Sequence, residues 1–308
     1  MPSRSCPFCD SDTPHFIGTR VDAWAKCRNC RSVFRDVTPT RFRQLHGEAF
    51  KDSEFIKSAT ALAGGAPSTG LWSALALTGT SVLEIGPGAG YLLAAAQKDG
   101  RQVTAVESSE PHRDFIRETW GIDAVFAGLD ELPAGRTFDA IMAINVFEHI
   151  YDIEGFLRSV RAILAPGGTF FVSTPNGASL EANVLRAWWS MCKVHDHVSF
   201  PSPAGMTAAA RASGLRIERI WSAGLPFEFP VSALTAARDR FVARRETTAE
   251  AGPAPVADPA ARARVGTFSN SVKAGMGRFY SLAAPFDPTA RLLSALGRAG
   301  TIKARLTR

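Results

Sequence analysis

The sequence lacks any long apolar run and has no apolar stretch near its start. A helix that crosses a bilayer needs about 18 or more consecutive apolar residues, and no run of that kind occurs in the 308 residues. A membrane-spanning helix is therefore excluded. The opening residues, MPSRSCPFCD, also lack the apolar core of a secretory signal. We therefore predict a cytosolic protein.

Excess basic charge is confined to one end of the chain. Residues 231–308 contain 13 Lys and Arg against 5 Asp and Glu, whereas residues 1–230 contain 22 against 24. An enzyme that follows a phosphate backbone presents a strongly basic surface. The first 230 residues do not indicate such a surface, and we expect nucleic acid not to be the main partner.

Cysteine is scarce and unevenly placed. Of five cysteines, four lie in the first 30 residues, as Cys6-x-x-Cys9 and Cys27-x-x-Cys30. In a cytosolic chain two such pairs indicate a metal site before disulfides, and four thiolates suit tetrahedral Zn²⁺. A redox pair and a ribbon without metal are the alternatives. The fifth cysteine, Cys192, is predicted to be a core residue.

The residue after each cysteine pair departs from the usual pattern of a zinc knuckle. That position often has glycine, because the backbone there favours a left-handed φ. Asp10 and Arg31 occupy it here. Asp tolerates the left-handed region, and Arg tolerates it less well.

Apolar segments alternate with helical segments between residues 80 and 222. The expected strands are 80–85, 102–107, 122–127, 138–144, 169–174 and 215–222, and the expected helices are 91–98, 110–119, 153–164 and 203–213. Apolar strands separated by helices predict a parallel sheet with crossover helices. The predicted fold class is α/β, a Rossmann-like, mainly parallel sheet with helices on both faces.

Composition divides the chain into four parts. We predict a zinc ribbon of two hairpins at 1–36, a helical connector at 37–78, an α/β domain at 79–224, and a basic helical extension or cap at 225–308. Helices are expected at 39–64 and 67–78 of the connector. The extension contains an Ala/Pro-rich loop at 247–263, and its last residues, GTIKARLTR, predict a final strand.

The stretch VLEIGPGAG, residues 82–90, predicts a strand that runs into a nucleotide-binding turn. Its glycines, Gly86, Gly88 and Gly90, do not match the dinucleotide pattern G-x-G-x-x-G, and the P-loop Lys-Ser/Thr is missing. Glu84 stands two residues before the first glycine, where it would repel a pyrophosphate. An acid there suits a ligand with a cationic end, although an ordinary turn with an incidental acid is an alternative.

Other polar residues follow the later strands, and in an open parallel sheet such residues gather at the edge where ligands bind. They are Glu107 after the second strand, Leu129 and Asp130 after the third, and Asn145, Glu148 and His149 after the fourth. A carboxylate at the position of Glu107 can accept hydrogen bonds from two ribose hydroxyls.

Together these motifs resemble the class I S-adenosylmethionine-dependent methyltransferases. Glu84–Gly90 matches the first motif of that family, E/D-x-G-x-G-x-G, at every fixed position. The segments 138–139 and 146–150 match its FD and hydrophobic-EH signatures, and Leu164–Gly168 matches its L-x-PGG turn. The resemblance covers about 80–222, and it implies that 79–224 is a methyltransferase domain whose cofactor is S-adenosylmethionine.

The resemblance implies further detail about site and substrate. The ribbon, Pro175-Asn176 and the segment 197–200 (HVSF) resemble bacterial methyltransferases of sugar, surface-polysaccharide and natural-product pathways. That family often has an acid near the adenine amino group. Leu129 occupies the corresponding position here, with Asp130 one residue later, so the adenine contact is expected through backbone atoms.

Methyl transfer from a sulfonium needs alignment of the reacting atoms and, for a neutral nucleophile, removal of a proton. Histidine suits the second task. His197 is the preferred base or substrate-orienting residue, with His195 and His149 as further candidates. Structural hydrogen bonds are the alternative roles, and a metal bound in the cluster at 195–197 is a minor alternative. Trp188-Trp189 would wall the acceptor site or simply pack.

The predicted function is methylation, at oxygen or carbon, of a small-molecule or saccharide acceptor. The alternative is an RNA-modifying methyltransferase that uses the ribbon and the basic tail, and a non-catalytic cofactor-binding scaffold is a third reading. The tail segment ALTAARDRFVARR interleaves Arg with apolar residues. It would cap the acceptor pocket or lie at the inner membrane face. The sequence names neither the acceptor nor the oligomeric state.

Overall fold

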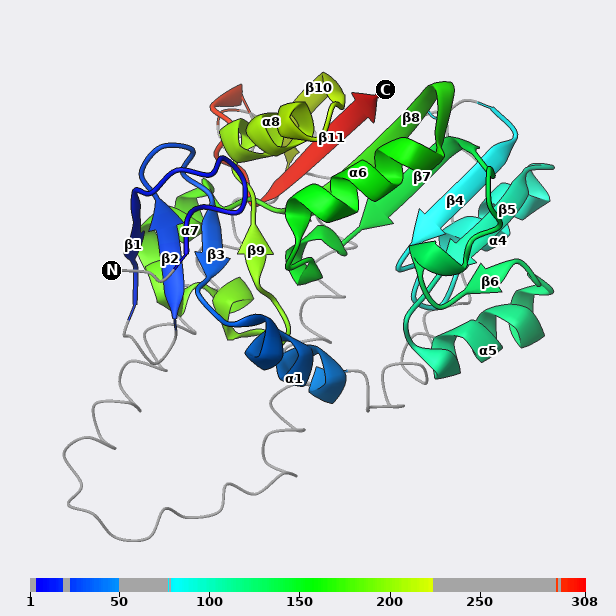
Figure 1. Ribbon diagram of the computed structural model, residues 1–308, viewed down its shortest axis with the longest axis horizontal. Coiled ribbons are helices and arrows are strands. Elements are labelled where there is room, and N and C mark those ends of the chain that lie inside the picture. The colour runs from blue at the N-terminus through cyan, green and yellow to red at the C-terminus, as the bar shows by residue number, and fades with distance from the viewer. Residues whose placement is uncertain (1–3, 19–22, 50–76, 78, 224–291, 293–294) are drawn as a thin grey trace, which may run out of the picture.

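The computed structural model describes residues 4–18, 23–49, 77, 79–223, 292 and 295–308. Two sheets organise these residues (Figure 1). The predicted helix at 67–78, the Ala/Pro-rich loop and the basic segment of the tail lie outside the described residues, apart from single positions. Of the predicted helix at 39–64, the described part is α1 (Pro39–Ala49).

The large sheet has the strand order β10-β11-β8-β7-β4-β5-β6. Its strands in chain order are β4 (Ser81–Ile85), β5 (Gln102–Val106), β6 (Val125–Phe126), β7 (Phe138–Ile144), β8 (Leu164–Pro175), β10 (Arg216–Ala223) and β11 (Thr301–Thr307). The pairs among β4–β8 are parallel, whereas β11 pairs antiparallel with both β8 and β10. The predicted α/β fold with a mainly parallel sheet is confirmed.

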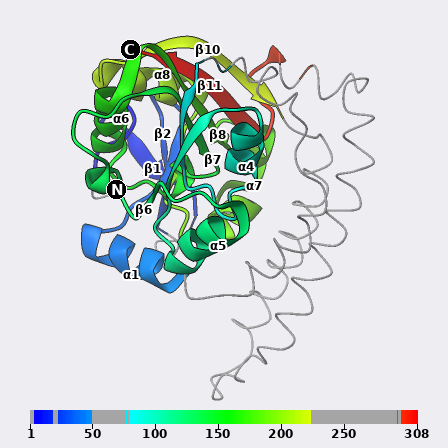
Figure 2. The ribbon, with the colours of Figure 1, turned by 90° about the vertical axis from the view of Figure 1, so that its right-hand side faces the viewer.

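Helices cover both faces of the large sheet, as predicted (Figure 2). They are α4 (Tyr91–Lys98), α5 (Glu110–Trp120), α6 (Ile153–Ile163) and α8 (Pro203–Ala212). Alternate residues of each strand point to opposite faces. Leu83 and Ile141 therefore pack with the face of α6 and α8, whereas Val82 and Met142 pack with the face of α4. The hydrophobic effect thus secures the sheet from both sides.

The last described strand enters the sheet between two earlier strands, second from its edge. GTIKARLTR forms β11, which confirms the predicted final strand, and β11 lies between β8 and β10 although it is last in the chain. Ile302, Ala304 and Leu306 alternate along it and are fully buried. The interval predicted as a helical extension, 225–308, therefore ends in a strand of the large sheet, because these three side chains complete its core.

Two strands differ in length from the prediction. β6 is only Val125–Phe126, shorter than the predicted strand 122–127, because only these two residues pair with β5. β8 begins at Leu164, five residues before the predicted start, because Leu164 pairs with Phe138 of β7. The Pro166-Gly167-Gly168 turn therefore bulges out of the ladder between Leu164 and Thr169, with Gly167 at φ 77°.

The small sheet has the order β1-β2-β3-β9 and is antiparallel throughout. Its strands are β1 (Pro14–Phe16), β2 (Trp24–Cys27), β3 (Val33–Arg35) and β9 (Ser199–Phe200). The first three come from the predicted ribbon, and β9 comes from the segment after β8. Figure 1 shows β9 between β3 and the large sheet, so the ribbon is joined to the α/β domain by a shared ladder.

The chain between β8 and β9 is built from short helical turns: α7 (Leu180–Leu185), η3 (Arg186–Trp188) and η4 (Ser190–Lys193). Trp189 is buried and lies 4.9 Å, ring to ring, from Phe200. Packing is thus the observed role of Trp189, and Cys192 is buried as predicted. Every helix in the described ranges is too short or too polar to span a bilayer.

Candidate functional site

The turn after β4 gives each of its three glycines a left-handed backbone, with φ 64° at Gly86, 54° at Gly88 and 74° at Gly90. A Cβ on Gly86 would lie 2.4 Å from Cγ2 of Val146. A Cβ on Gly88 would meet nothing within 4 Å. The turn therefore packs closely against the end of β7 on one side and leaves its backbone open to a ligand at Gly88.

Glu84, in β4 just before this turn, is 4% exposed, and its Oε2 atom has no hydrogen-bond partner within the described chain. Burial, and secondarily the charge of Glu107, raises the pKa of Glu84 to about 8. A buried carboxyl group with a free oxygen fits a ligand that brings a positive charge, because that charge would stabilise the ionised form. This observation supports the predicted cationic ligand.

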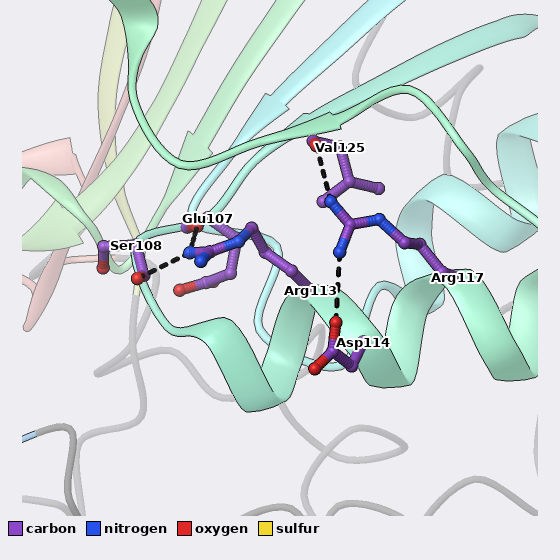
Figure 3. A network of polar contacts seen from close by, with 6 residues as sticks. All are labelled: Glu107, Ser108, Arg113, Asp114, Arg117 and Val125. Atoms are coloured by element: carbon purple, nitrogen blue, oxygen red, sulfur yellow. Dashed lines mark hydrogen bonds and ion pairs between the residues drawn. The ribbon is translucent and has the colours of Figure 1, made fainter. Parts of the chain in front are cut away.

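Glu107 follows β5 and is 5% exposed. Its Oε1 accepts a hydrogen bond from the backbone N–H of Ser109 at 2.9 Å, and its Oε2 accepts one from Gly88 at 3.1 Å. Arg113 of α5 donates to the carbonyls of Glu107 and Ser108 (Figure 3). Glu107 is thus held beside the glycine turn.

The predicted cofactor-binding residues after the third and fourth strands make fewer contacts with the glycine turn than Glu107 does. Leu129 and Asp130 lie in η1 (Leu129–Glu131), where Leu129 packs against the core and Asp130 is exposed. Asn145 is exposed, has a left-handed φ of 55°, and donates through its backbone N–H to Ser173. The roles predicted for these three residues in cofactor binding stay predictions.

Asp139 of the FD signature has a structural role. Its Oδ2 accepts hydrogen bonds from the backbone N–H groups of Thr80 and Ser81, at 2.8 and 3.0 Å. These two hydrogen bonds lower the pKa of Asp139. The side chain therefore anchors the start of β4, whereas the glycine turn follows the other end of that strand.

His149 and Asp196 form a pair that connects two segments. His149 ends the turn η2 (Phe147–His149), and its Nδ1 lies 2.9 Å from Oδ2 of Asp196. Burial alone would lower the pKa of His149, but the close contact with the negatively charged Asp196 outweighs it and raises that pKa. A histidine held in this way is a stronger base than an isolated one.

His197 has a different environment from the one expected of a base. It is 8% exposed, and its Nδ1–H donates to the carbonyl of Met191 at 3.1 Å. Burial, followed by the nearby charge of His149, lowers the pKa of His197 to about 4. His197 is therefore neutral near pH 7, with Nε2 as an acceptor, which suits orienting a substrate better than taking its proton. His195 is exposed, and its carbonyl accepts from Arg35.

The atoms that could ligate a metal here belong to Glu148, His149 and His197, which lie within 4.8 Å of one another. This set differs from the cluster at 195–197 considered from the sequence. Glu148 is 2% exposed and accepts from Oγ1 of Thr174 at 2.9 Å. Since His149 also contacts Asp196 and His197 also bonds to the carbonyl of Met191, we interpret the group as a network of polar contacts.

The four ribbon cysteines converge. Cys6 Sγ lies 3.6 Å from Cys30 Sγ, and Cys9 Sγ lies 3.7 Å from Cys27 Sγ. Four sulfurs at about 2.3 Å from a tetrahedral zinc would be about 3.8 Å apart, so the residues fit the ion. All four are free thiols. Burial raises the pKa of the Cys9 thiol, and a bound cation would offset that cost.

The backbones of the two knuckles are similar to each other and to that of a zinc knuckle. Asp10 and Arg31 both have a left-handed φ, of 52° and 69°. Their N–H groups donate to the carbonyls of Cys6 and Cys27, at 2.8 and 3.1 Å. The left-handed geometry usual at this position is therefore kept without glycine.

Sequence reasoning missed Asp196 as the partner of His149. The residue appeared only as the middle of a possible metal cluster, because local spacing does not reveal a contact between segments 47 positions apart. An acid beside the preferred histidine was the one available signal.

Comparison with known protein families shows a match to a methyltransferase domain over residues 53–220, which is more than half of the chain. Among curated relatives, a ubiquinone biosynthesis O-methyltransferase of Methylocella silvestris is 32% identical over 151 residues, which cover 45% of this chain and 59% of the relative. One of Rhizobium leguminosarum bv. trifolii is 31% identical over 159 residues, covering 47% and 62%. The chain thus spans about three fifths of the length of these relatives.

Two solved structures show a distant similarity to this chain. An S-adenosylmethionine-dependent methyltransferase from Mesorhizobium loti has a TM-score of 0.46 and 16% identity, and the match covers 79% of this chain and 99% of that one. A protein from Galdieria sulphuraria described as a sarcosine dimethylglycine methyltransferase has a TM-score of 0.43 and 15% identity, with coverage of 82% and 83%.

Proposed function

This chain belongs to the methyltransferase domain family, and we propose that it transfers a methyl group from S-adenosylmethionine to a hydroxyl group of a small molecule or saccharide. The names of the matched relatives, O-methyltransferases of ubiquinone biosynthesis, support oxygen as the acceptor atom. Carbon is the alternative acceptor atom.

The observation that carries the proposal is the contact between the glycine turn and the segment bearing His149. β4 and β7 are neighbouring parallel strands, with Ile85 opposite Ala143. Beyond their ends Gly86 packs directly against Val146, one residue before η2. A ligand on the glycine turn therefore lies beside the turn that supplies a base.

Three features would hold the cofactor, which supplies a transferable methyl group on a cationic sulfur. The open backbone at Gly88 allows close approach of its amino-acid portion. Glu84 favours the ammonium group, and Glu107 accepts hydrogen bonds from the ribose hydroxyls. Because Glu107 already bonds to Gly88 and Ser109, its oxygens are oriented before any ligand binds.

His149 is the group we assign to proton removal. An alcohol must lose its proton as oxygen attacks, and a base whose pKa lies near neutrality does this best. Asp196 raises the basicity of His149, whereas His197, with its lowered pKa, orients the acceptor through its neutral ring. Alignment of oxygen, methyl and sulfur supplies most of the remaining rate acceleration.

We also propose that Cys6, Cys9, Cys27 and Cys30 hold one structural zinc ion. Support comes from the sulfur spacing, which fits a tetrahedral site, and from the two left-handed knuckles. A site with four protein ligands leaves no open position for substrate, so the ion contributes structure and no chemistry.

The decisive experiment is incubation with methyl-labelled S-adenosylmethionine and pools of candidate acceptors, followed by mass spectrometry. We expect a small molecule or saccharide to gain the mass of one methylene and the label. Label in RNA, with salt-dependent retention of that RNA, would instead support the RNA-modifying alternative. Absence of both S-adenosylmethionine and S-adenosylhomocysteine binding would contradict the proposal itself.

A further inference from the structure

We propose that the four-cysteine ribbon positions the His149–Asp196 pair, so that a zinc ion bound by the ribbon sets the geometry of the acceptor site. The inference rests on the proposed function for its catalytic meaning and on the contacts below for its structure. Each cysteine knuckle supports one member of the pair, and the metal joins the two knuckles.

The first knuckle supports the turn that carries His149. Phe8 lies between Cys6 and Cys9 and is 2% exposed. Its ring stacks on that of Phe147 at 6.5 Å between centroids. Phe147 opens η2, the three-residue turn that ends at His149. A shift of the first knuckle would therefore move the backbone of His149.

The second knuckle supports the segment that carries Asp196. The strand after it, β3, pairs with β9, with Val33 opposite Phe200. Arg35 of β3 also forms hydrogen bonds with the backbone of residues before and after Asp196. Its N–H donates to the carbonyl of Val198 at 2.8 Å, and its guanidinium Nη1 donates to the carbonyl of His195 at 2.8 Å.

Buried hydroxyl groups tie the second knuckle to the same segment. Ser32, fully buried, accepts hydrogen bonds through Oγ from the thiol of Cys30 at 3.2 Å and from the N–H of Ser202 at 3.0 Å. Gly205 of α8 approaches so closely that a Cβ there would lie 2.0 Å from Oγ of Ser32. The packing around the cysteines leaves little freedom for independent movement.

The close sulfur pairs cross from one knuckle to the other. Cys6 pairs with Cys30, and Cys9 pairs with Cys27. A bound ion would therefore connect the support of His149 to the support of Asp196. The cofactor turn touches the His149 segment through Gly86 and Val146. Its other supports are independent of the ribbon, because β4 pairs with β5 and Gly90 packs against Ile116 of α5.

The test follows the protonation of His149 in the full chain by NMR of ¹³C,¹⁵N-histidine-labelled protein, together with calorimetry of S-adenosylhomocysteine binding. The groups that face His149 are Glu148 of its own turn, and Asp196 and His197 of the opposing segment. With zinc bound, we expect His149 to titrate above its ordinary value of 6.5. Asp196→Asn gives the size of the downward shift when the pair is broken.

Removal of zinc with a chelator should shift the titration of His149 down, toward that of Asp196→Asn. Affinity for S-adenosylhomocysteine should change by less than about threefold, which is about 0.7 kcal/mol because a tenfold change corresponds to about 1.4 kcal/mol. An unchanged His149 titration in the folded, zinc-free protein overturns the proposal. Failure of S-adenosylhomocysteine to bind the zinc-loaded protein contradicts the proposed function instead, while the titration still tests the coupling.

A second variant decides the matter if the zinc-free chain does not fold. Ser32→Ala keeps all four cysteines and removes the hydroxyl that joins Cys30 to Ser202. In the zinc-loaded variant we expect a smaller downward shift of the His149 titration. The matched control is Ser213→Ala, which removes another buried serine hydroxyl, one without a partner in the described chain, at the end of α8. Equal titrations in Ser32→Ala and this control would overturn the proposal.

Discussion

The carboxylate of Glu107 accepts a hydrogen bond from the backbone N–H of Gly88 at 3.1 Å, and this bond joins the end of the second strand to the glycine turn of the first. Its other oxygen accepts from Ser109. The two neighbouring strands therefore present one continuous polar surface, on which a ligand meets backbone and carboxylate together.

Glu107→Ala should weaken binding of S-adenosylhomocysteine at least about tenfold, because a charge-assisted hydrogen bond contributes about 1.5–3 kcal/mol. Isothermal titration calorimetry measures the change. Asp114→Ala is the control, since this exposed acid on α5 pairs only with Arg117 in Figure 3 and should leave the affinity unchanged. Equal affinities of wild type and Glu107→Ala would remove Glu107 from the cofactor site.

Binding of the cofactor should release close to one proton at pH 7. The pKa of Glu84 is raised to about 8 in the free protein, so the carboxyl is mostly protonated, and a nearby ammonium group would ionise it. Calorimetry in buffers of different ionisation enthalpy counts the protons. Glu84→Gln should abolish the release, and a binding enthalpy that does not depend on the buffer in wild type would refute the role of Glu84.

The same shift predicts a pH dependence of stability in the absence of cofactor. Because burial raises the folded-state pKa of Glu84 from 4.5 to about 8, its favourable contribution is complete below pH 4.5 and is lost as pH rises through 8. The free energy of unfolding should therefore fall more steeply across this interval in wild type than in Glu84→Gln. Urea unfolding at a series of pH values measures both slopes.

Purified protein should contain one zinc ion per chain, measurable by elemental analysis. Cys27→Ser should lose the ion and lower the melting temperature, because a buried thiolate ligand is removed and metal binding is linked to folding. Cys192→Ser is the matched control, since Cys192 is also buried but lies outside the cluster. Full zinc content in Cys27→Ser would rule out the four-cysteine site.

Leu306→Ala should lower the free energy of unfolding by about 2–5 kcal/mol, the range for a buried leucine truncated to alanine. Leu306 is fully buried in β11, between Phe170 of β8 and Ile217 of β10. Lys303→Ala, on the same strand but half-buried, should cost less than about 1 kcal/mol. Equal costs in chemical unfolding would show that β11 does not complete the core.

Much of the sheet could be predicted because its signals are local. The strand 138–144 was predicted with its observed bounds, since a run that is apolar apart from Asp139 indicates a buried parallel strand. The start of β8 was misplaced because it depends on pairing with Phe138, and no property of Leu164 itself reveals that pairing. The role of His197, predicted as base or substrate-orienting residue, stays a prediction. Burial lowers its pKa, and the sequence does not show that burial.

The sequence by itself determined the left-handed glycine turn, the acid before it, the acid after the second strand and the two cysteine pairs, because each is a short-range pattern imposed by backbone sterics or by ligand chemistry. Only the tertiary structure decided that the last strand enters between β8 and β10, and that Asp196 meets His149 beside a ribbon strand. Those contacts join segments far apart in the chain, and the burial of apolar side chains selects among the many pairings that local patterns permit.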